Sequence, residues 1–543
     1  MRGGGADSGA YELLPLSPDE EALSKTHRQK IWNPVHFGSR RLCFVLGTSI
    51  VVLLGLSWVM LSVVWDDGVK DALQINLTHL KPTNATLRAR QQSQYDLLKQ
   101  HHEYLNHIGR AHNFEAMDKL ASCLNGTTWC PERPVILSSY IYIGYEFEKM
   151  SPPGGEMIWF KSVSEMVENE GYIILHIHDY LLFATTSRLV PDLVHMYWAE
   201  EKRVISCVLD PRCIADYVPT IGGQDLSLDV PQEERGTIPL ARLFATTWWG
   251  SYPKSWGHGL AFIADPDPNE WFSWNPLGPA WSLTPYDYPN NTFLPWSIEN
   301  VCNLSPYTLH EDRKDIVLLY AKHTRIFRDA RIKPDFWNSD VVKALPFKFI
   351  TTAKVVEDIP LPEGLESLGT MSREDYDVLL GSVKAVVGLG VPTISPTVYS
   401  ALCQGTPLVL PIYEEVEMNE LVKLYGLRYS QHPMAVALGQ PYVHTYMGNN
   451  QTQLIEAVKQ TMEVNLDRFI PPKMQEPTVR KGIHQVLTID FEAKAHDAIA
   501  TNGGNIPAHQ DHTRMHLLEK NNLVIIANGT RPRWTEDMLN GTW

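Results

Sequence analysis

Short apolar runs alternate with amphipathic stretches in two blocks of this 543-residue chain. In the first block, residues 134–147 (PVILSSYIYIGYEF) and 172–177 (YIILHI) are rich in β-branched and aromatic side chains and predict strands. Between them, residues 157–171 (MIWFKSVSEMVENEG) carry apolar positions at helical spacing and predict a helix. The first block therefore begins as a strand–helix–strand unit.

The second block continues the alternation. Its predicted strands are residues 315–321, 347–353, 385–390 and 407–411, and its predicted helices are residues 372–384, 396–404 and 453–464. The first helix has a capping pair in Ser372 and Asp375, and the second has Pro396 at its first position and Gly405 just past its end. Strands that alternate with helices predict parallel sheets covered on both faces. We therefore expect an α/β protein with two Rossmann-like domains that face a cleft.

The region between the blocks, residues 222–300, is dense in Pro and Trp and shows no clear period. We expect long loops over a core there. The polar segment 65–130 is expected to be a solvated spacer, although the apolar spacing around Tyr95, Leu98 and Leu105 leaves open a self-associating stem and hence a homodimer.

One longer apolar run lies near the N-terminus. Residues 42–64 contain no charged side chain over 23 positions, which is long enough for a helix that crosses a bilayer. Arg40 and Arg41 precede this run, and Asp66 and Asp67 follow it. Basic flanks stay on the cytosolic side, so the sequence predicts a single-pass type II signal anchor with the body of the protein in the lumen. A cleaved signal peptide fits less well because the run starts late and is long.

Glycosylation sequons and cysteines agree with a lumenal body. Eight N-x-S/T sequons all follow the apolar run: Asn76, Asn84, Asn125, Asn290, Asn303, Asn450, Asn528 and Asn540. Six of the seven cysteines also follow it, and an even set in an oxidising compartment favours disulfides. The pairs closest in sequence are Cys123 with Cys130 and Cys207 with Cys213.

Charge and motifs exclude some classes of partner. The net charge is −15, so nucleic acid, which requires a positive footprint, is not expected to bind. Asp265 and Asp267 fit a DxD metal motif, but they lie in a Pro-rich loop rather than at a strand end. The HIHD run that begins at His176 follows a strand and is more often structural, and the histidines near the C-terminus lie in a polar tail without a Cys or carboxylate framework, so no metal is predicted.

The segment VKAVVGLGVPTISPTVYSALCQGTPLVLP (residues 383–411) carries the strongest local signal for a ligand. Ligands of open α/β sheets bind where strands end, and Gly388 and Gly390 would let a ligand approach the backbone there. Backbone N–H groups at the start of the helix that follows Ser395 could hold a diphosphate without a metal. A well-capped packing unit without a ligand explains the same residues equally well.

Four quoted runs carry a resemblance to a known family: LLYAKHT, LGTMSREDYDVLLGSVKAVVGLGVPTISP, ALCQGTPLVLP and SQHPMAVALGQPYVHTYMGNNQTQLIEAVKQ. Together with NTFLPWSIENVCN, they resemble glycosyltransferase family 18, the α-1,6-mannosylglycoprotein 6-β-N-acetylglucosaminyltransferases, from about residue 291 to 495. The resemblance implies a GT-B fold and a type II protein of the Golgi membrane. It also implies metal-independent, inverting transfer of GlcNAc from UDP-GlcNAc to a mannose 6-hydroxyl of a protein N-glycan, without a cofactor.

The resemblance also assigns roles to residues. SPPGGEMIWF is similar to a family loop that precedes a catalytic Glu, which makes Glu156 the candidate base; an ordinary acidic residue in a first helical turn is the alternative. Lys322 matches a family lysine that would neutralise the departing diphosphate, or it is a solvated lysine at a strand end. The remaining expected donor-binding residues are Gly390, Thr393, Ser395 and Ser400.

Two departures from the family pattern affect the donor. Ser400 stands where the family has a Glu that grips the ribose hydroxyls, and residues 392–395 replace a PYEG-like loop. A different nucleotide sugar or acceptor, or a catalytically silent glycan-binding scaffold, therefore stays open. Gln431 and His432 of SQHP match family positions, but the sequence indicates no physical role for them.

The domain organisation expected from these patterns has six parts. They are a cytosolic tail (1–41), a transmembrane anchor (42–64), a lumenal stem (65–130), an acceptor domain (131–310), a donor domain (311–495) and a peripheral tail (496–543).

Overall fold

The structure is a computed structural model that describes residues 85–105, 108–149, 155–217, 220–221, 224–225, 230–248, 250–251, 273–288, 290–304, 307–328, 336–344, 346–356, 359–392, 394–413 and 430–507. Its α-helices are α2 (Ala85–Gln100), α3 (Arg110–Leu124), α4 (Ile141–Phe147), α5 (Gly155–Asn169), α6 (Tyr180–Leu189), α7 (Glu201–Leu209), α8 (Glu299–Leu304), α9 (Ser339–Ala344), α10 (Arg373–Ser382), α11 (Thr397–Cys403), α13 (Pro433–Val436), α14 (Gln451–Met462), α15 (Glu476–Thr488) and α16 (Phe491–Thr501).

The first six-stranded sheet has the order β2-β1-β3-β6-β7-β8, and all its neighbouring strands are parallel. Its strands are β1 (Val135–Ser138), β2 (Ile173–His176), β3 (Val194–Glu200), β6 (Leu243–Thr246), β7 (Ser282–Thr284) and β8 (Thr292–Phe293). The strand–helix–strand unit predicted at its start is confirmed as β1, α5 and β2. A separate antiparallel pair is formed by β4 (Thr220–Ile221) and β5 (Gln224–Asp225).

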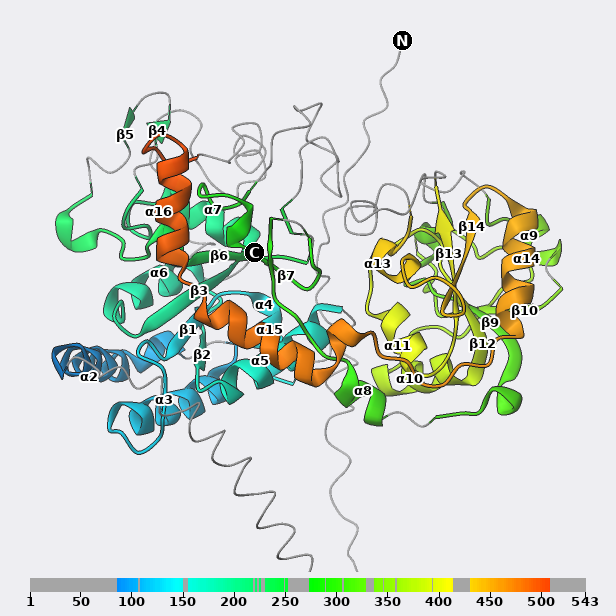
Figure 1. The fold of residues 1–543 in the computed structure, drawn as a ribbon, viewed down its shortest axis with the longest axis horizontal. Coiled ribbons are helices and arrows are strands. Elements are labelled where there is room, and N and C mark those ends of the chain that lie inside the picture. Colours follow the sequence, from blue (N-terminus) through cyan, green and yellow to red (C-terminus); the bar gives the residue numbers. More distant parts are fainter. Residues whose placement is uncertain are drawn as a thin grey trace, which may run out of the picture. The chain divides into compact units, whose positions relative to one another are not determined.

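The second six-stranded sheet has the order β11-β10-β9-β12-β13-β14 and is also parallel. Its strands are β9 (Lys314–Leu319), β10 (Lys348–Thr351), β11 (Glu366–Ser367), β12 (Val383–Val387), β13 (Leu408–Ile412) and β14 (Val443–Met447). Alternate residues of its central strands enter different apolar clusters: Val317 and Val387 pack on one face, and Leu318 and Val386 on the other. Both faces are therefore buried, as expected for a parallel sheet. The prediction of two parallel α/β sheets is confirmed (Figure 1).

Two local predictions differ from the structure. The strand expected over residues 134–147 ends at Ser138, and residues 141–147 form helix α4 instead. Ile143 and Gly144 of this helix are buried, and Gly144 lies against the ring of His176, so packing overrides the strand propensity of the segment. The middle region is also more than loops, because it supplies β6, β7 and β8 to the first sheet.

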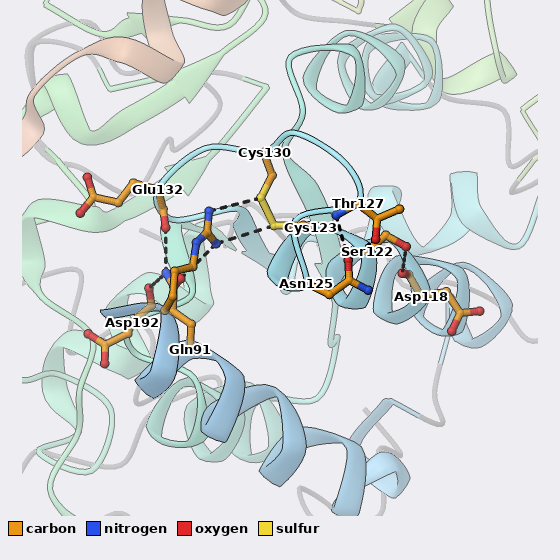
Figure 2. The surroundings of a disulfide bond; sticks show 10 residues. Gln91, Asp118, Ser122, Cys123, Asn125, Thr127, Cys130, Glu132 and Asp192 are labelled. Atoms are coloured by element: carbon orange, nitrogen blue, oxygen red, sulfur yellow. Dashed lines mark hydrogen bonds between the residues drawn. A yellow bond between two sulfur atoms is a disulfide. The ribbon is translucent and has the colours of Figure 1, made fainter. Parts of the chain in front are cut away.

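The structure also corrects the expectation that residues 65–130 form a solvated spacer. From Ala85 onward the segment forms α2 and α3, and Leu98, Leu105 and Leu120 are buried in the same apolar cluster as the first sheet. The amide of Gln91 donates to the backbone oxygens of Glu132 (2.7 Å) and Asp192 (2.9 Å), which anchors α2 (Figure 2).

The C-terminal helices α15 and α16 pack against the first sheet. This packing begins before residue 495, the predicted end of the second domain. His195 of β3 bonds to the backbone oxygen of Leu487 in α15 at 2.9 Å, and the ring of Phe244 in β6 packs edge-on against Phe491 of α16. Figure 1 shows both helices in orange beside the strands of the first sheet.

Three disulfides are present in the described residues. Cys123–Cys130 (Figure 2) and Cys207–Cys213 confirm the two predicted pairs. The third, Cys302–Cys403, joins α8 to α11 across 101 positions of sequence. It therefore ties the segment that follows the first sheet to a helix of the second.

No helix in the described residues is long and apolar enough to cross a membrane. The predicted anchor at residues 42–64 lies outside the described residues and stays a prediction.

Candidate functional site

The candidate site lies at the edges where the parallel strands end. Lys322 follows β9 by three residues, and the loop from Gly388 to Pro396 connects β12 to α11. Because the carboxyl ends of parallel strands share one edge, these two segments belong to the same edge of the second sheet. At the first sheet, Glu156 lies in the first turn of α5.

The side chain of Gln431 forms hydrogen bonds with the backbone of the loop that follows β12. The N–H of Gly390 donates to Oε1 of Gln431 at 2.9 Å, and Nε2 of Gln431 donates to the carbonyl oxygen of Pro392 at 2.8 Å. The Tyr413 hydroxyl donates to the carbonyl oxygen of Gly390 at 3.0 Å. A side chain on Gly388 would collide with the Gln431 amide, which explains why glycine stands there. One buried amide therefore fixes both sides of the turn at Val391–Pro392.

His432 fixes the far end of the same loop. The N–H of Ser395 donates to Nδ1 of His432 at 3.4 Å. Burial lowers the pKa of His432 to about 3, so the ring is neutral at ordinary pH. An accepting Nδ1 in a neutral ring places the proton on Nε2. The SQHP run thus has a structural role that the sequence did not reveal, because Gln431 is 41 positions from Gly390.

Replacing Gln431 with Leu should destabilise the protein. The substitution keeps the approximate size of the side chain but leaves the buried N–H of Gly390 without its partner, at about 1–3 kcal/mol, and also removes the bond to the half-buried carbonyl of Pro392. Urea unfolding would measure the loss, with exposed Gln92→Leu as the control, which should stay within about 0.5 kcal/mol of the native protein. Equal stabilities of the two variants would contradict the role of Gln431.

Glu156 is a half-buried carboxyl at the start of a helix. Burial raises its pKa above the ordinary value, while hydrogen bonds from the N–H groups of Glu156 and Gly155 and the charge of Lys322 oppose that rise. A helix N-terminus favours the ionised form of a carboxyl group, but at Glu156 desolvation outweighs that effect. A carboxylate with a raised pKa is a better proton acceptor, as a general base requires.

The start of α5 lies against the start of α11. A Cβ on Gly155 would lie 2.5 Å from Cδ of Pro396 and 2.8 Å from Cη2 of Trp248. Only glycine fits between these rings, so the residue before Glu156 touches the residue that precedes α11. The electrostatic influence of Lys322 on Glu156 agrees with this contact. The structure thus brings together Glu156, Lys322 and the loop that carries Gly390 and Ser395.

Ser400, one of the expected donor-binding residues, has a side-chain partner in the structure. It is buried in α11, and its Oγ accepts a 2.7 Å hydrogen bond from the guanidinium of Arg373, whose Nε also donates to Asp377 at 2.8 Å. Burial raises the pKa of Asp377, and the charge of Arg373 opposes that rise. Thr393 lies outside the described residues.

No three His, Cys, Asp or Glu side chains in the described residues are grouped so that they could hold a metal ion. The HIHD run is built into the fold: the backbone N–H and C=O of His176 bond to the Asn113 amide, and Asp179 caps α6 by accepting from the N–H of Leu182. Asp265, Asp267 and the C-terminal histidines lie outside the described residues.

Residues 267–490 match the model of Glycosyltransferase family 18. Over these residues the chain is similar to the family 18 glycosyltransferases. The human Alpha-1,6-mannosylglycoprotein 6-beta-N-acetylglucosaminyltransferase A is 26% identical over 231 residues, which cover 41% of this chain and 29% of that protein. The Caenorhabditis elegans Alpha-1,6-mannosylglycoprotein 6-beta-N-acetylglucosaminyltransferase is 24% identical over 239 residues, covering 40% of this chain and 33% of that protein. The chain thus spans at most about a third of these curated relatives.

Solved structures share a more distant similarity. The crystal structure of the glycotransferase of kitacinnamycin covers 72% of this chain and 99% of its own at 12% identity and a TM-score of 0.29. The α,α-trehalose-phosphate synthase (UDP-forming) of Burkholderia vietnamiensis covers 73% of this chain and 78% of its own at 10% identity and a TM-score of 0.20. Because these TM-scores are low, the assignment of the fold class depends on the two parallel sheets described above and not on these similarities.

The family match covers the site unevenly. Lys322, Gly390 and the SQHP run lie inside the matched residues, which confirms the family resemblance for that part of the chain. Glu156 lies before residue 267, so the family match does not extend to it, and it is connected to the matched residues through the contact of Gly155 with Pro396.

Proposed function

We propose that the protein is an inverting glycosyltransferase of GT-B type that moves N-acetylglucosamine from UDP-GlcNAc to a mannose 6-hydroxyl of protein N-glycans. The observation that carries this proposal is the family 18 match over residues 267–490 together with the names of the relatives. Two six-stranded parallel sheets, with the start of α5 against the residue that precedes α11, suit a reaction between two bound substrates.

Glu156 is the proposed base. It takes the proton from the attacking mannose hydroxyl as the oxygen bonds to the anomeric carbon, and the nucleoside diphosphate leaves from the opposite face. Lys322 balances the charge of the leaving diphosphate, and the Gly390–Ser395 loop binds the donor. No step requires a metal in this scheme.

A second candidate keeps the fold and the base but uses a different nucleotide sugar. The specific observation in its favour is the Ser400–Arg373 hydrogen bond, which places a cation where the family pattern has a carboxylate. A guanidinium cannot accept hydrogen bonds from a ribose diol, so the nucleoside would be bound in another way.

Transfer assays on the purified full chain with EDTA present test the proposal. Saturable UDP-GlcNAc binding by calorimetry and transfer to a mannose-terminated N-glycan would support it. Saturable binding of another nucleotide sugar would favour the second candidate. Failure to bind any of them would contradict both candidates and leave the catalytically silent, glycan-binding scaffold standing.

We also propose that the protein is anchored in the Golgi membrane by residues 42–64, with residues 65–543 in the lumen. The one-sided sequons and the three disulfides support an oxidising, glycosylating compartment. Endoglycosidase-sensitive glycans on the full chain, and carbonate-resistant membrane association lost on deleting residues 42–64, are the expected results.

Replacing Lys322 with Gln should move the acid limb of the pH–kcat/KM profile to higher pH. Lys322 lowers the pKa of Glu156, and a base acts only when it is deprotonated, so removing the cation raises the pH at which activity appears. Lys384→Gln is the matched control, because Lys384 pairs with Asp315 near the opposite ends of the strands. If the acid limb of Lys322→Gln stays at the native pH, Lys322 does not influence the pKa of the catalytic base.

A further inference from the structure

Two aromatic residues connect the edge of the first sheet to Glu156. Trp248 follows the end of β6 by two residues, and Tyr286 follows the end of β7 by two residues. Their rings pack edge to face with centroids 5.4 Å apart. Trp248 also packs on Trp159 of α5 with centroids 6.0 Å apart, and its tip lies against Gly155. Packed side chains therefore lead from Tyr286 to the residue before Glu156.

The Tyr286 hydroxyl is buried without a hydrogen-bond partner among the described residues. The residue is 3% exposed, and its oxygen is inaccessible to solvent. An unsatisfied buried hydroxyl is costly and is uncommon in folded proteins unless a ligand or water completes it.

The surroundings of this hydroxyl contain groups from both sheets. Burial raises the pKa of Tyr286 well above its ordinary value, and the nearby Tyr399, Tyr288, Glu156 and Tyr320 raise it further. The phenol therefore stays neutral, and a neutral hydroxyl can both donate and accept a hydrogen bond. Tyr399 belongs to α11, and Tyr320 directly follows β9, so the hydroxyl lies within electrostatic reach of the loops that meet at Gly155.

We propose that the Tyr286 hydroxyl binds a hydroxyl group of the acceptor sugar, next to the one that Glu156 deprotonates. This inference rests on the proposed function. A pyranose ring carries adjacent hydroxyls that match a neutral phenol, and Trp248 holds the phenol ring in place. The acceptor rather than the donor is assigned because Tyr286 extends from the sheet whose edge is packed against the start of α5.

Tyr286→Phe tests the inference through two effects of opposite sign. The substitution removes only the oxygen, so the free protein should be as stable as the native one or more stable, because an unsatisfied group is lost. The KM for a mannose-terminated N-glycan should rise about tenfold, equivalent to about 1.4 kcal/mol, while the KM for UDP-GlcNAc stays unchanged.

Tyr197→Phe is the control. Tyr197 lies in β3, and its hydroxyl is also buried without a partner in the described part of the chain, but the charged groups that act on it are Arg242, Arg133 and Asp192. This variant should gain stability in the same way without any change in acceptor KM. A panel of monodeoxy mannosides extends the test. The mannoside that lacks the hydroxyl bound by Tyr286 should have the same KM with Tyr286→Phe and with the native protein, because the hydrogen bond is already lost when either partner is removed.

The outcomes separate this inference from the proposed function. If the native protein transfers sugar and Tyr286→Phe keeps its acceptor KM, the inference is overturned and the proposed function stands. If the native protein transfers nothing, calorimetry with the acceptor glycan alone decides. Weaker binding by Tyr286→Phe would support the inference without the enzyme activity, and equal binding or none would overturn it.

Discussion

Replacing Glu156 with Gln is expected to lower the transfer rate by about 10²- to 10⁴-fold, the usual contribution of a general base. The amide keeps the shape of the side chain but cannot accept the proton of the attacking hydroxyl. The donor should still bind with unchanged affinity, because its proposed binding groups lie on the second sheet. Single-turnover transfer and calorimetry with UDP-GlcNAc would measure the two quantities separately.

The stability of Glu156→Gln supplies an internal check on folding. The pKa of Glu156 is raised in the folded protein, so the ionised carboxyl is disfavoured there and its folded state loses stability as pH rises through that pKa. Gln carries no charge, so the variant should match the native protein at acidic pH and be more stable than it at neutral pH. Glu165→Gln on the same helix, where the side chain is exposed and bonds to Asn300, should change neither activity nor this pH dependence. A fully active Glu156→Gln would remove Glu156 from the mechanism.

The strands of the sheets could be predicted from the sequence wherever they are long enough to show a hydrophobic pattern. β9, β10, β12 and β13 each have four to six residues, of which at least half are buried, and are bounded by turn or helix signals. β7 and β8 have three and two residues in a Pro-rich region, which is too short for a period to appear. They become strands only because β6 presents a parallel edge to β7 and β7 presents one to β8.

The candidate site was predictable in its backbone but not in its side-chain contacts. Gly390 and the helix that follows could be placed from the apolar runs and the turn residues around them. The side chains that form hydrogen bonds with the site residues are distant in sequence: Gln431 bonds to Gly390 across 41 positions, and Arg373 bonds to Ser400 across 27. Such pairings depend on how the helices pack on the sheet, which no local pattern encodes.

The helix that follows β12 is also shorter than predicted. With Pro396 at its first position and Gly405 past its end, the helix was expected over residues 396–404, whereas α11 spans Thr397–Cys403, with Pro396 at its cap position. Ser395 still contributes locally, because its Oγ accepts from the N–H of Thr397 at 3.1 Å. With seven residues, this helix has little stability of its own and depends on tertiary contacts.

Removing the Cys302–Cys403 disulfide is therefore expected to have the largest effect on stability. The bond closes a loop with a sequence separation of 101 and anchors the last residue of α11 to α8. In the chain-entropy model, a loop of this length contributes about 4.7 kcal/mol, a large share of the 5–15 kcal/mol that stabilises a typical domain. The double variant Cys302→Ala/Cys403→Ala should unfold at a much lower guanidinium concentration than the native protein.

Cys207→Ala/Cys213→Ala is a matched comparison, because all four cysteines are buried and each double variant removes the same atoms. The sequence separation of this pair is only 6, so the same model predicts a loss of about 2 kcal/mol. The difference between the two variants isolates the effect of loop length from the effect of lost packing. Equal losses would show that Cys302–Cys403 stabilises the protein only as a local contact. A larger loss for Cys302→Ala/Cys403→Ala, accompanied by weaker UDP-GlcNAc binding in that variant alone, would show that the bond also holds α11 where the donor loop needs it.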